Sequence, residues 1–214
     1  MNNELSKVQE IVENAPEVVL TRDDDQRVAL HWAVSFQHEE VVMYLLSHME
    51  SVDLDELKDK AGWTPFHIAC AVGNMSIIIA LYNRRTKPDL DLTTAQGVTA
   101  LHLAVSKKHI EVCKFLLVNG ASVRIRDKKQ QLPLHRAAAL GSMGLVQLLC
   151  EAKSPVNSQD FEGWTPLFHA LAEGHGDVAV LLVNKYNADE NLENSQGSKA
   201  VNVALNDQIK NYFI

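Results

Sequence analysis

A block of eight residues returns through the chain at nearly constant spacing. It is clearest at 62–69 (GWTPFHIA), and it recurs at 97–104 (GVTALHLA), 130–137 (QQLPLHRA) and 163–170 (GWTPLFHA). A weaker copy lies at 26–33 (QRVALHWA) and a degenerate one at 197–204. The last residues of these blocks are alanines at 33, 69, 104, 137, 170 and 204, so the gaps are 36, 35, 33, 33 and 34 residues. Such a period indicates copies of one supersecondary unit, stacked so that each buries its apolar face against its neighbours.

The residues within each block predict a turn followed by a helix. Asp59, Asp127, Asp160 and Asn194 stand three residues before a glycine-type position and suit a tight turn. The glycines at 62, 97, 163 and 197 allow the positive φ that such turns often need. Thr64 and Thr165 are predicted helix N-caps, with Pro65 and Pro166 at the first helical position.

A second helix is predicted in each unit, because apolar residues recur at three- and four-residue spacing over 39–46, 110–117 and 177–182. A helix–turn–helix unit with this period is typical of ankyrin repeats. We therefore predict an all-α ankyrin-repeat solenoid of about seven repeats with β-hairpin-like tips, forming one domain over 1–214. The expected repeats are 1–22 (partial), 23–58, 59–93, 94–126, 127–159, 160–193 and 194–214, with the extra residues of the second and third in loops at 51–58 and 84–91.

The first repeat is expected to be incomplete. Val8, Ile11 and Val12 fit its second helix, and nothing before them fits its first. Since a solenoid usually needs polar capping ends, either the chain has lost its start or this end is less well protected than usual.

Composition and motifs favour a non-catalytic, intracellular protein. The chain starts without a basic, apolar leader, and its apolar runs are too short to span a membrane. Cys70, Cys113 and Cys150 form no CxxC pair and are expected to be buried free thiols. The net charge of −7 argues against nucleic-acid binding. No phosphate loop, dinucleotide fingerprint or HExxH helix is present, so we expect no cofactor.

Three local patterns are assigned structural roles. The histidines at 31, 67, 102 and 135 are expected to bond to neighbouring backbone and threonine hydroxyls, since metal ligands need local spacing that they lack. Asp53-Leu54-Asp55 resembles the start of a calcium loop, but Lys58 stands where glycine is required. Gly174-His175-Gly176 is expected to be the turn between two paired helices.

The positions that the scaffold does not demand are candidates for binding another protein. Tips and first helices line the concave face of such a solenoid, where repeat proteins usually bind. All three tryptophans lie at these positions, and exposed Trp and Arg are common interface anchors. Binding is favoured over packing for Trp32, whereas for Trp63 and Trp164 the two are equally supported. The predicted partner-binding residues are Asp24, Asp25, Arg27, Trp32, Ser35, Phe36, Trp63, Ile68, Lys107, Lys128, Arg136, Trp164, His169 and Glu173.

Charge is segregated along the chain. Residues 1–58 contain 4 Lys/Arg and 13 Asp/Glu, residues 94–159 contain 9 and 3, and residues 160–193 contain 1 and 7. A charge run is usually a solvated face, but this acidic–basic–acidic order favours selection of a partner with the opposite order.

Beyond the generic repeat, GWTPLFHALAEGHGD at 163–177, GWTPFHIAC at 62–70 and NGASVRIRDK at 119–128 closely resemble the gankyrin-like proteasome-assembly chaperones, in their yeast form. LHWAVSFQ at 30–37 and LPLHRAA at 132–138 support the resemblance, which covers nearly the whole chain in register. It implies a seven-repeat solenoid whose concave face binds the C-terminal domain of one ATPase subunit of the proteasome regulatory particle through complementary charges. It also implies that the protein escorts this subunit during base assembly and blocks premature docking on the core particle.

Carried over residue by residue, the resemblance implies an interface made by positions already named above: Asp25, Arg27, Trp32, Phe36, Trp63, Lys107, Arg136, Trp164 and Glu173. We accordingly expect a protein that is monomeric on its own, works in cytoplasm and nucleus, and contacts neither membrane nor nucleic acid. The LxCxE motif of gankyrin is absent, because Ala152 follows Leu148-Leu149-Cys150-Glu151. The alternatives are another ankyrin adaptor, such as an inhibitor of a kinase or transcription factor, and an enzyme.

Overall fold

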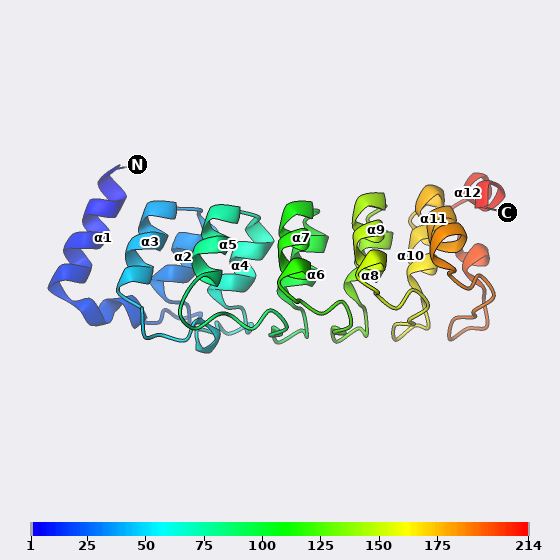
Figure 1. The fold of residues 1–214 in the computed structure, drawn as a ribbon. Coiled ribbons are helices and arrows are strands. Elements are labelled where there is room, and N and C mark those ends of the chain that lie inside the picture. Colours follow the sequence, from blue (N-terminus) through cyan, green and yellow to red (C-terminus); the bar gives the residue numbers. More distant parts are fainter. Residues whose placement is uncertain (1, 214) are drawn as a thin grey trace. The chain divides into compact units, whose positions relative to one another are not determined.

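A computed structural model describes residues 2–213, which fall into two compact units that divide between Gln96 and Gly97. Each unit is built from antiparallel helix pairs (Figure 1). Among the described residues there is no strand, only an isolated antiparallel bridge between Glu193 and Lys199. The all-α prediction is confirmed, and the division into seven repeats remains a prediction.

The first unit contains helix α1 followed by two helix pairs. Helix α1 packs against α3, the pairs α2/α3 and α4/α5 form helical hairpins, and α2 packs against α4 as α3 packs against α5. The Val8–Val12 segment lies inside α1, as expected for a second helix. The elements of this unit are α1 (Asn2–Asn14), the 3-10 helix η1 (Pro16–Leu20), α2 (Ala29–Ser35), α3 (Glu39–Ser47), the 3-10 helix η2 (Leu54–Glu56), α4 (Pro65–Val72) and α5 (Met75–Tyr82).

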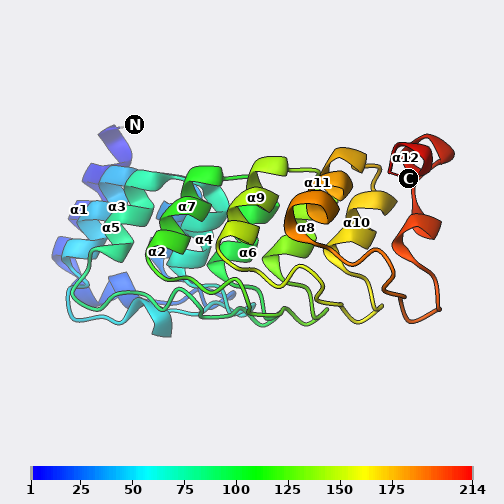
Figure 2. The same ribbon diagram turned by 45° about the vertical axis from the view of Figure 1, so that its right-hand side comes forward.

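The second unit repeats the same hairpin three times. In Figure 2 the turns that precede α6, α8 and α10 lie at one common end of these helices. Helices α6, α8 and α10 pack on one another in that order, and α7, α9 and α11 do likewise. The elements are α6 (Ala100–Ser106), α7 (Ile110–Val118), α8 (Pro133–Ala139), α9 (Met143–Glu151), α10 (Pro166–Ala172), α11 (Gly176–Tyr186), the 3-10 helix η3 (Ala200–Val203) and α12 (Asp207–Phe213).

The predicted turn and helix starts are borne out with one difference. Gly62, Gly97, Gly163 and Gly197 all have positive φ. The Thr64 hydroxyl accepts the backbone N–H of His67, as an N-cap should. Thr165 occupies the N-cap position of α10 without such a bond. Here Phe168 stands at the third helical position, where the other units have histidine, so the hydroxyl has no imidazole partner.

The repeat histidines are structural. In His67 and His102, Nδ1 lies 2.9 Å from the hydroxyl of Thr64 or Thr99, and Nε2 lies 3.0 and 3.1 Å from the carbonyls of Leu92 and Gln131. His31 and His135 make the same pair of bonds, with the backbone N–H of the residue before the helix replacing the hydroxyl. All four imidazoles are buried, and this burial lowers their pKa, to about 4 for His102 and His135.

The assignments of the cysteines and of the turn at 174–175 also agree. Cys70, Cys113 and Cys150 are buried free thiols, and burial raises the pKa of Cys113 and Cys150 to about 12. Gly174 and His175 form the turn before α11. Within residues 2–213, no three His, Cys, Asp or Glu side chains are grouped so that they could hold a metal ion. None of the helices in that range has the length and apolar character of a membrane span.

Candidate protein-binding face

An aspartate organises the turns at 23–27, 59–63, 127–131 and 160–164, at the base of the candidate face. In Asp23, Asp59, Asp127 and Asp160, Oδ1 accepts the backbone N–H groups of the residues two and four positions later, at 2.8–3.0 Å. Both bonds use the same oxygen, so the carboxylate is fixed in orientation and Oδ2 stays available for a side chain.

The second carboxylate oxygen, Oδ2, contacts the side chain nine residues later wherever that side chain carries a hydrogen-bond donor. Oδ2 of Asp23 accepts from Trp32 Nε1 at 2.8 Å, Asp127 from Arg136 Nη2 at 2.7 Å, and Asp160 lies 2.9 Å from His169 Nε2. Nine residues after Asp59 stands Ile68, which offers no donor. Arg27 from the preceding turn binds Asp59 instead, at 3.0 Å. These contacts fix Arg27, Trp32, Arg136 and His169 in position.

In the first unit, Arg27, Trp32 and Phe36 form a cation–aromatic cluster. The Arg27 guanidinium lies 4.9 Å from the centre of the Trp32 ring, and Trp32 stacks on Phe36 at 6.1 Å between centroids. Trp32 is 37% and Phe36 63% exposed, so large aromatic area faces solvent. Hydrogen bonds from the Arg27 backbone and the Trp32 indole lower the pKa of the Asp23 carboxyl. The cluster therefore combines a fixed cation, two exposed rings and an ionised carboxylate, as protein-binding anchors often do.

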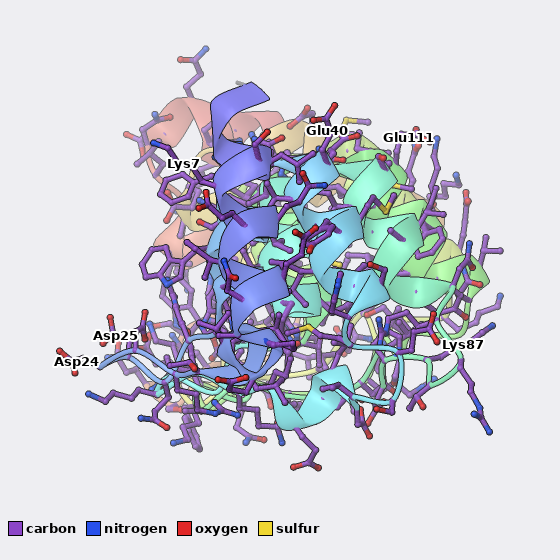
Figure 3. All side chains as sticks on the ribbon, turned by 90° about the vertical axis from the view of Figure 1, so that its left-hand side faces the viewer. Lys7, Asp24, Asp25, Glu40, Lys87 and Glu111 are labelled. Carbon is purple, nitrogen blue, oxygen red and sulfur yellow. The ribbon has the colours of Figure 1, made fainter. Side chains whose placement is uncertain are left out.

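The remaining candidates of this unit differ in exposure. Asp24 and Asp25 are exposed at the turn before α2, where Figure 3 shows them projecting from the ribbon. Ser35 is half-buried at the end of α2. Trp63 is half-buried, with its ring 6.5 Å from that of His67, which is a packing contact. Ile68 is 6% exposed and presents little surface to a partner.

In the second unit, a groove of about 230 Å³ runs beside α6, α8 and α10. Arg136 lines the groove and donates to the Ser106 hydroxyl at 3.1 Å as well as to Asp127. Asp160 accepts from Gln131 Nε2 at 3.1 Å in addition to its contact with His169. Burial works to raise the pKa of Asp160, but the bonds from Gln131 and His169 outweigh it and the pKa is lowered. The groove wall is therefore lined by polar groups that the Asp127 and Asp160 carboxylates hold in place.

Trp164 is half-buried against this wall. Its ring lies 5.8 Å from Phe168 and 5.2 Å from His169. His169, in turn, meets His135 edge to face at 5.7 Å. The sequence supports packing and binding equally for Trp164. The packing contacts are present, and the ring is also partly exposed, so that part of it could contact a partner.

The exposed charges of this unit stand at helix ends and turn tips. Lys107 follows the last residue of α6 and Glu173 the last residue of α10, the same position in their repeats as Phe36 after α2. Lys128 is exposed in the turn next to Asp127. The candidates thus form two sets, one in each unit, and their roles in binding remain predictions.

Sequence reasoning missed the positioning role of the turn aspartates. The sequence pattern predicts only turn positions for Asp59, Asp127 and Asp160, and it indicates no role for Asp23. The signal that could have found them is the nine-residue spacing from Asp23 to Trp32, Asp127 to Arg136 and Asp160 to His169.

Comparison with known proteins shows which family the chain belongs to. Models of ankyrin repeats match residues 25–60, 49–127 and 101–194. A Saccharomyces cerevisiae protein described as "Probable 26S proteasome regulatory subunit p28" is 59% identical over 215 residues, covering 100% of this chain and 94% of the relative. The chain belongs to this p28 family of ankyrin-repeat proteins.

More distant relatives agree with the fold of the p28 family. A Schizosaccharomyces pombe ankyrin repeat-containing protein, C6C3.08, is 36% identical, over 97% of this chain and 88% of its own. The crystal structure of the ankyrin repeat domain of Bcl-3 matches with a TM-score of 0.78 at 25% identity, covering 96% of this chain and 90% of that domain.

Proposed function

We propose that this protein is a non-catalytic chaperone for assembly of the base of the proteasome regulatory particle. It binds the C-terminal domain of one ATPase subunit and blocks premature docking of that subunit on the core particle. The observation that carries the proposal is the 59% identity, over the whole chain, to a relative described as a probable proteasome regulatory subunit. We further propose that it acts as a monomer, in cytoplasm and nucleus, without a cofactor.

The two sets of candidate residues support a protein partner. The first unit offers exposed aromatic rings beside the acidic Asp24 and Asp25, and the second offers the exposed Lys107 and Lys128. Rigid aromatic anchors give affinity, and opposite charges on a partner set register and association rate. A domain with a basic region facing the first unit and an acidic region facing Lys107 and Lys128 would fit both sets.

Affinity capture tests the proposal. The full chain is immobilised, and bound proteins from a yeast lysate are identified by mass spectrometry. We expect one ATPase subunit of the regulatory particle, without subunits of the core particle. The isolated C-terminal domain of that subunit should bind directly, and a Lys107→Glu/Lys128→Glu variant should bind it at least about tenfold more weakly. Capture of a kinase or transcription factor with no ATPase subunit would instead support the adaptor alternative.

A further inference from the structure

Two arginines and a serine from neighbouring loops line one pocket in the first unit. The pocket has a volume of about 400 Å³ and is lined by Glu50 and Ser51, which follow α3, and by Arg84 and Arg85, which follow α5. The loops at 51–58 and 84–91 are those that hold the extra residues of the second and third repeats. The pocket therefore belongs to these additions and not to the scaffold that all repeats share.

Arg84 is held in place by the end of helix α3. Its guanidinium donates to the backbone carbonyls of Leu46 at 3.1 Å and Val52 at 3.2 Å, and also to that of Met49. A cation at a helix C-terminus is stabilised by the carbonyls there, so its position is fixed. The Nε–H of the same guanidinium has no acceptor among the described residues. Arg84 thus keeps a positive charge at the pocket and an unused donor.

The Ser51 and Arg85 side chains are uncommitted. Both are exposed, and within residues 2–213 neither the Ser51 hydroxyl nor the Arg85 guanidinium makes a hydrogen bond or ion pair. Ser47 differs, because its hydroxyl donates to the Tyr44 carbonyl at 2.6 Å. Ser51 is therefore an accessible hydroxyl that shares a pocket with one fixed and one free guanidinium.

The residues around Ser51 are acidic. Glu50 precedes it, and Asp53, Asp55 and Glu56 follow within five positions. A protein kinase whose substrate groove is basic would be attracted to such a stretch. A phosphate added here would be repelled by these carboxylates unless a nearby cation offset them, and Arg84 and Arg85 are the cations that line the pocket.

We propose that Ser51 is a phosphorylation site whose phosphate pairs with Arg84 and Arg85 and so ties the loop at 51–58 to the loop at 84–91. A serine phosphate carries a charge of about −1.5 to −2 near pH 7, and opposite arginines it forms charge-assisted hydrogen bonds that order a loop. The site goes beyond the proposed function, because none of its residues is a candidate for binding the ATPase subunit.

The phosphoryl group comes from ATP bound to a separate protein kinase. The Ser51 Oγ attacks the γ-phosphorus, and the Oγ–P bond forms as the bond from that phosphorus to the β–γ bridging oxygen breaks. ADP leaves, and the hydroxyl proton passes to a base of the kinase.

The charge of the pocket favours a phosphate attached to Ser51 over one from another molecule. Glu50 lines the pocket together with the two arginines, so a free phosphate meets a weakly positive site. A phosphate on Ser51 is instead held beside the arginines at an effective concentration of about millimolar or more.

The first test places phosphoserine at position 51 during synthesis of the full chain and measures hydrogen exchange at Val52, whose N–H donates to the Met49 carbonyl at 2.9 Å. We expect exchange to slow about fivefold relative to the unmodified chain. Phosphoserine at position 47 is the control and should not slow it. Unchanged or faster exchange with phosphoserine at 51 would overturn the proposal.

Arg85→Gln separates pairing with arginine from a general effect of the phosphate. Arg85 is exposed and makes no bond in the fold, so the variant should fold, whereas Arg84 cannot be changed without releasing the end of α3. The slowing at Val52 should disappear or reverse in Arg85→Gln. Equal slowing with and without Arg85 would contradict the pairing.

Phosphorus NMR of the same chains reports the contact directly. The second pKa of the phosphate at Ser51 should lie about half a unit below its usual value of about 6 and return to it in Arg85→Gln, because a nearby cation favours the dianion. An ordinary pKa in the chain with both arginines would show that the phosphate stays in solvent.

Two further measurements identify the source of the phosphate. A purified kinase of the class that selects serines among acidic residues should modify Ser51, located by mass spectrometry; modification of Ser47 alone would overturn the assignment. Inorganic phosphate should not saturate the Arg85 side-chain resonance of the unmodified chain up to about 10 mM. Saturation below about 1 mM would mean that the pocket takes a phosphate from another molecule and would overturn Ser51 as its source.

Discussion

Asp127 holds Arg136 by a 2.7 Å contact in which only 5% of the aspartate side chain is exposed. The second oxygen of the same carboxylate closes the turn over 127–131. Arg136 is therefore both a candidate contact for a partner and the counter-charge of a buried group.

Arg136→Glu is accordingly expected to destabilise the protein, by about 3 kcal/mol, because it removes the partner of a buried carboxylate and adds a like charge. Urea unfolding measures the loss. Lys128→Glu in the same turn is the control and should stay within about 0.5 kcal/mol of the wild type, since Lys128 is exposed. Equal stability of the two variants would contradict a structural role for Arg136.

Lys107→Glu with Lys128→Glu should weaken binding of the ATPase domain by at least about tenfold without changing the melting temperature. Both side chains are exposed, so reversing their charge changes the electrostatic potential of the candidate binding face and not the fold. Wild-type association should slow as salt rises, because the Debye length falls from about 10 Å at 0.1 M to about 3 Å at 1 M. Stopped-flow kinetics and calorimetry measure both effects.

The control for this pair is Lys114→Glu. Lys114 is exposed on α7 and pairs with Glu111 on the same helix, away from the turns and first helices. It carries the same change in net charge per substitution. If Lys114→Glu weakened binding as much per substitution as the Lys107/Lys128 pair does, the net charge of the protein, and not the position of the two lysines, would control association.

The features that all repeats share could be predicted from the sequence, whereas the side-chain contacts that differ between repeats could not. The helix pairs, the positive φ at Gly62 and Gly163 and the bonding of His67 follow from a block whose residues do the same task in every unit. Ile68 and Arg136 occupy the same place in that block, yet Ile68 is buried and Arg136 forms an ion pair. Which outcome occurs depends on the donor that reaches the aspartate oxygen, a three-dimensional contact that position within the repeat does not specify.

The buried imidazoles should make stability depend on pH in the mildly acidic range. Burial lowers the pKa of His102 and His135 to about 4 in the folded chain, whereas histidine in an unfolded chain has a pKa of about 6.5. Between these values the unfolded state binds more protons, so the free energy of unfolding falls as pH falls from about 6.5 to about 4.

His102→Gln should remove about one proton from the difference between the unfolded and folded states. The slope of the unfolding free energy against pH should then fall by up to about 1.4 kcal/mol per pH unit, and stability at pH 7 should also fall. Urea titrations at intervals across this range measure the slope. An unchanged slope would mean that His102 is not the neutral, buried group that its bonds to Thr99 and Gln131 require.

Gly163→Ala should destabilise the protein more than Gly120→Ala, although both glycines have positive φ. An L-residue in this left-handed region costs about 1–2 kcal/mol, and both variants bear that cost. At Gly163 an added Cβ would also lie 2.6 Å from the backbone nitrogen of Ser195, in the next turn, whereas at Gly120 it would meet nothing within 4 Å. Ser195 cannot move freely, because its N–H donates to the Glu162 carbonyl at 3.0 Å. We expect a total loss of about 3 kcal/mol for Gly163→Ala, measured by urea unfolding, with hydrogen exchange rising at Ser195. Equal losses in the two variants would show that the close approach of the Ser195 backbone adds nothing to the cost of a side chain at position 163.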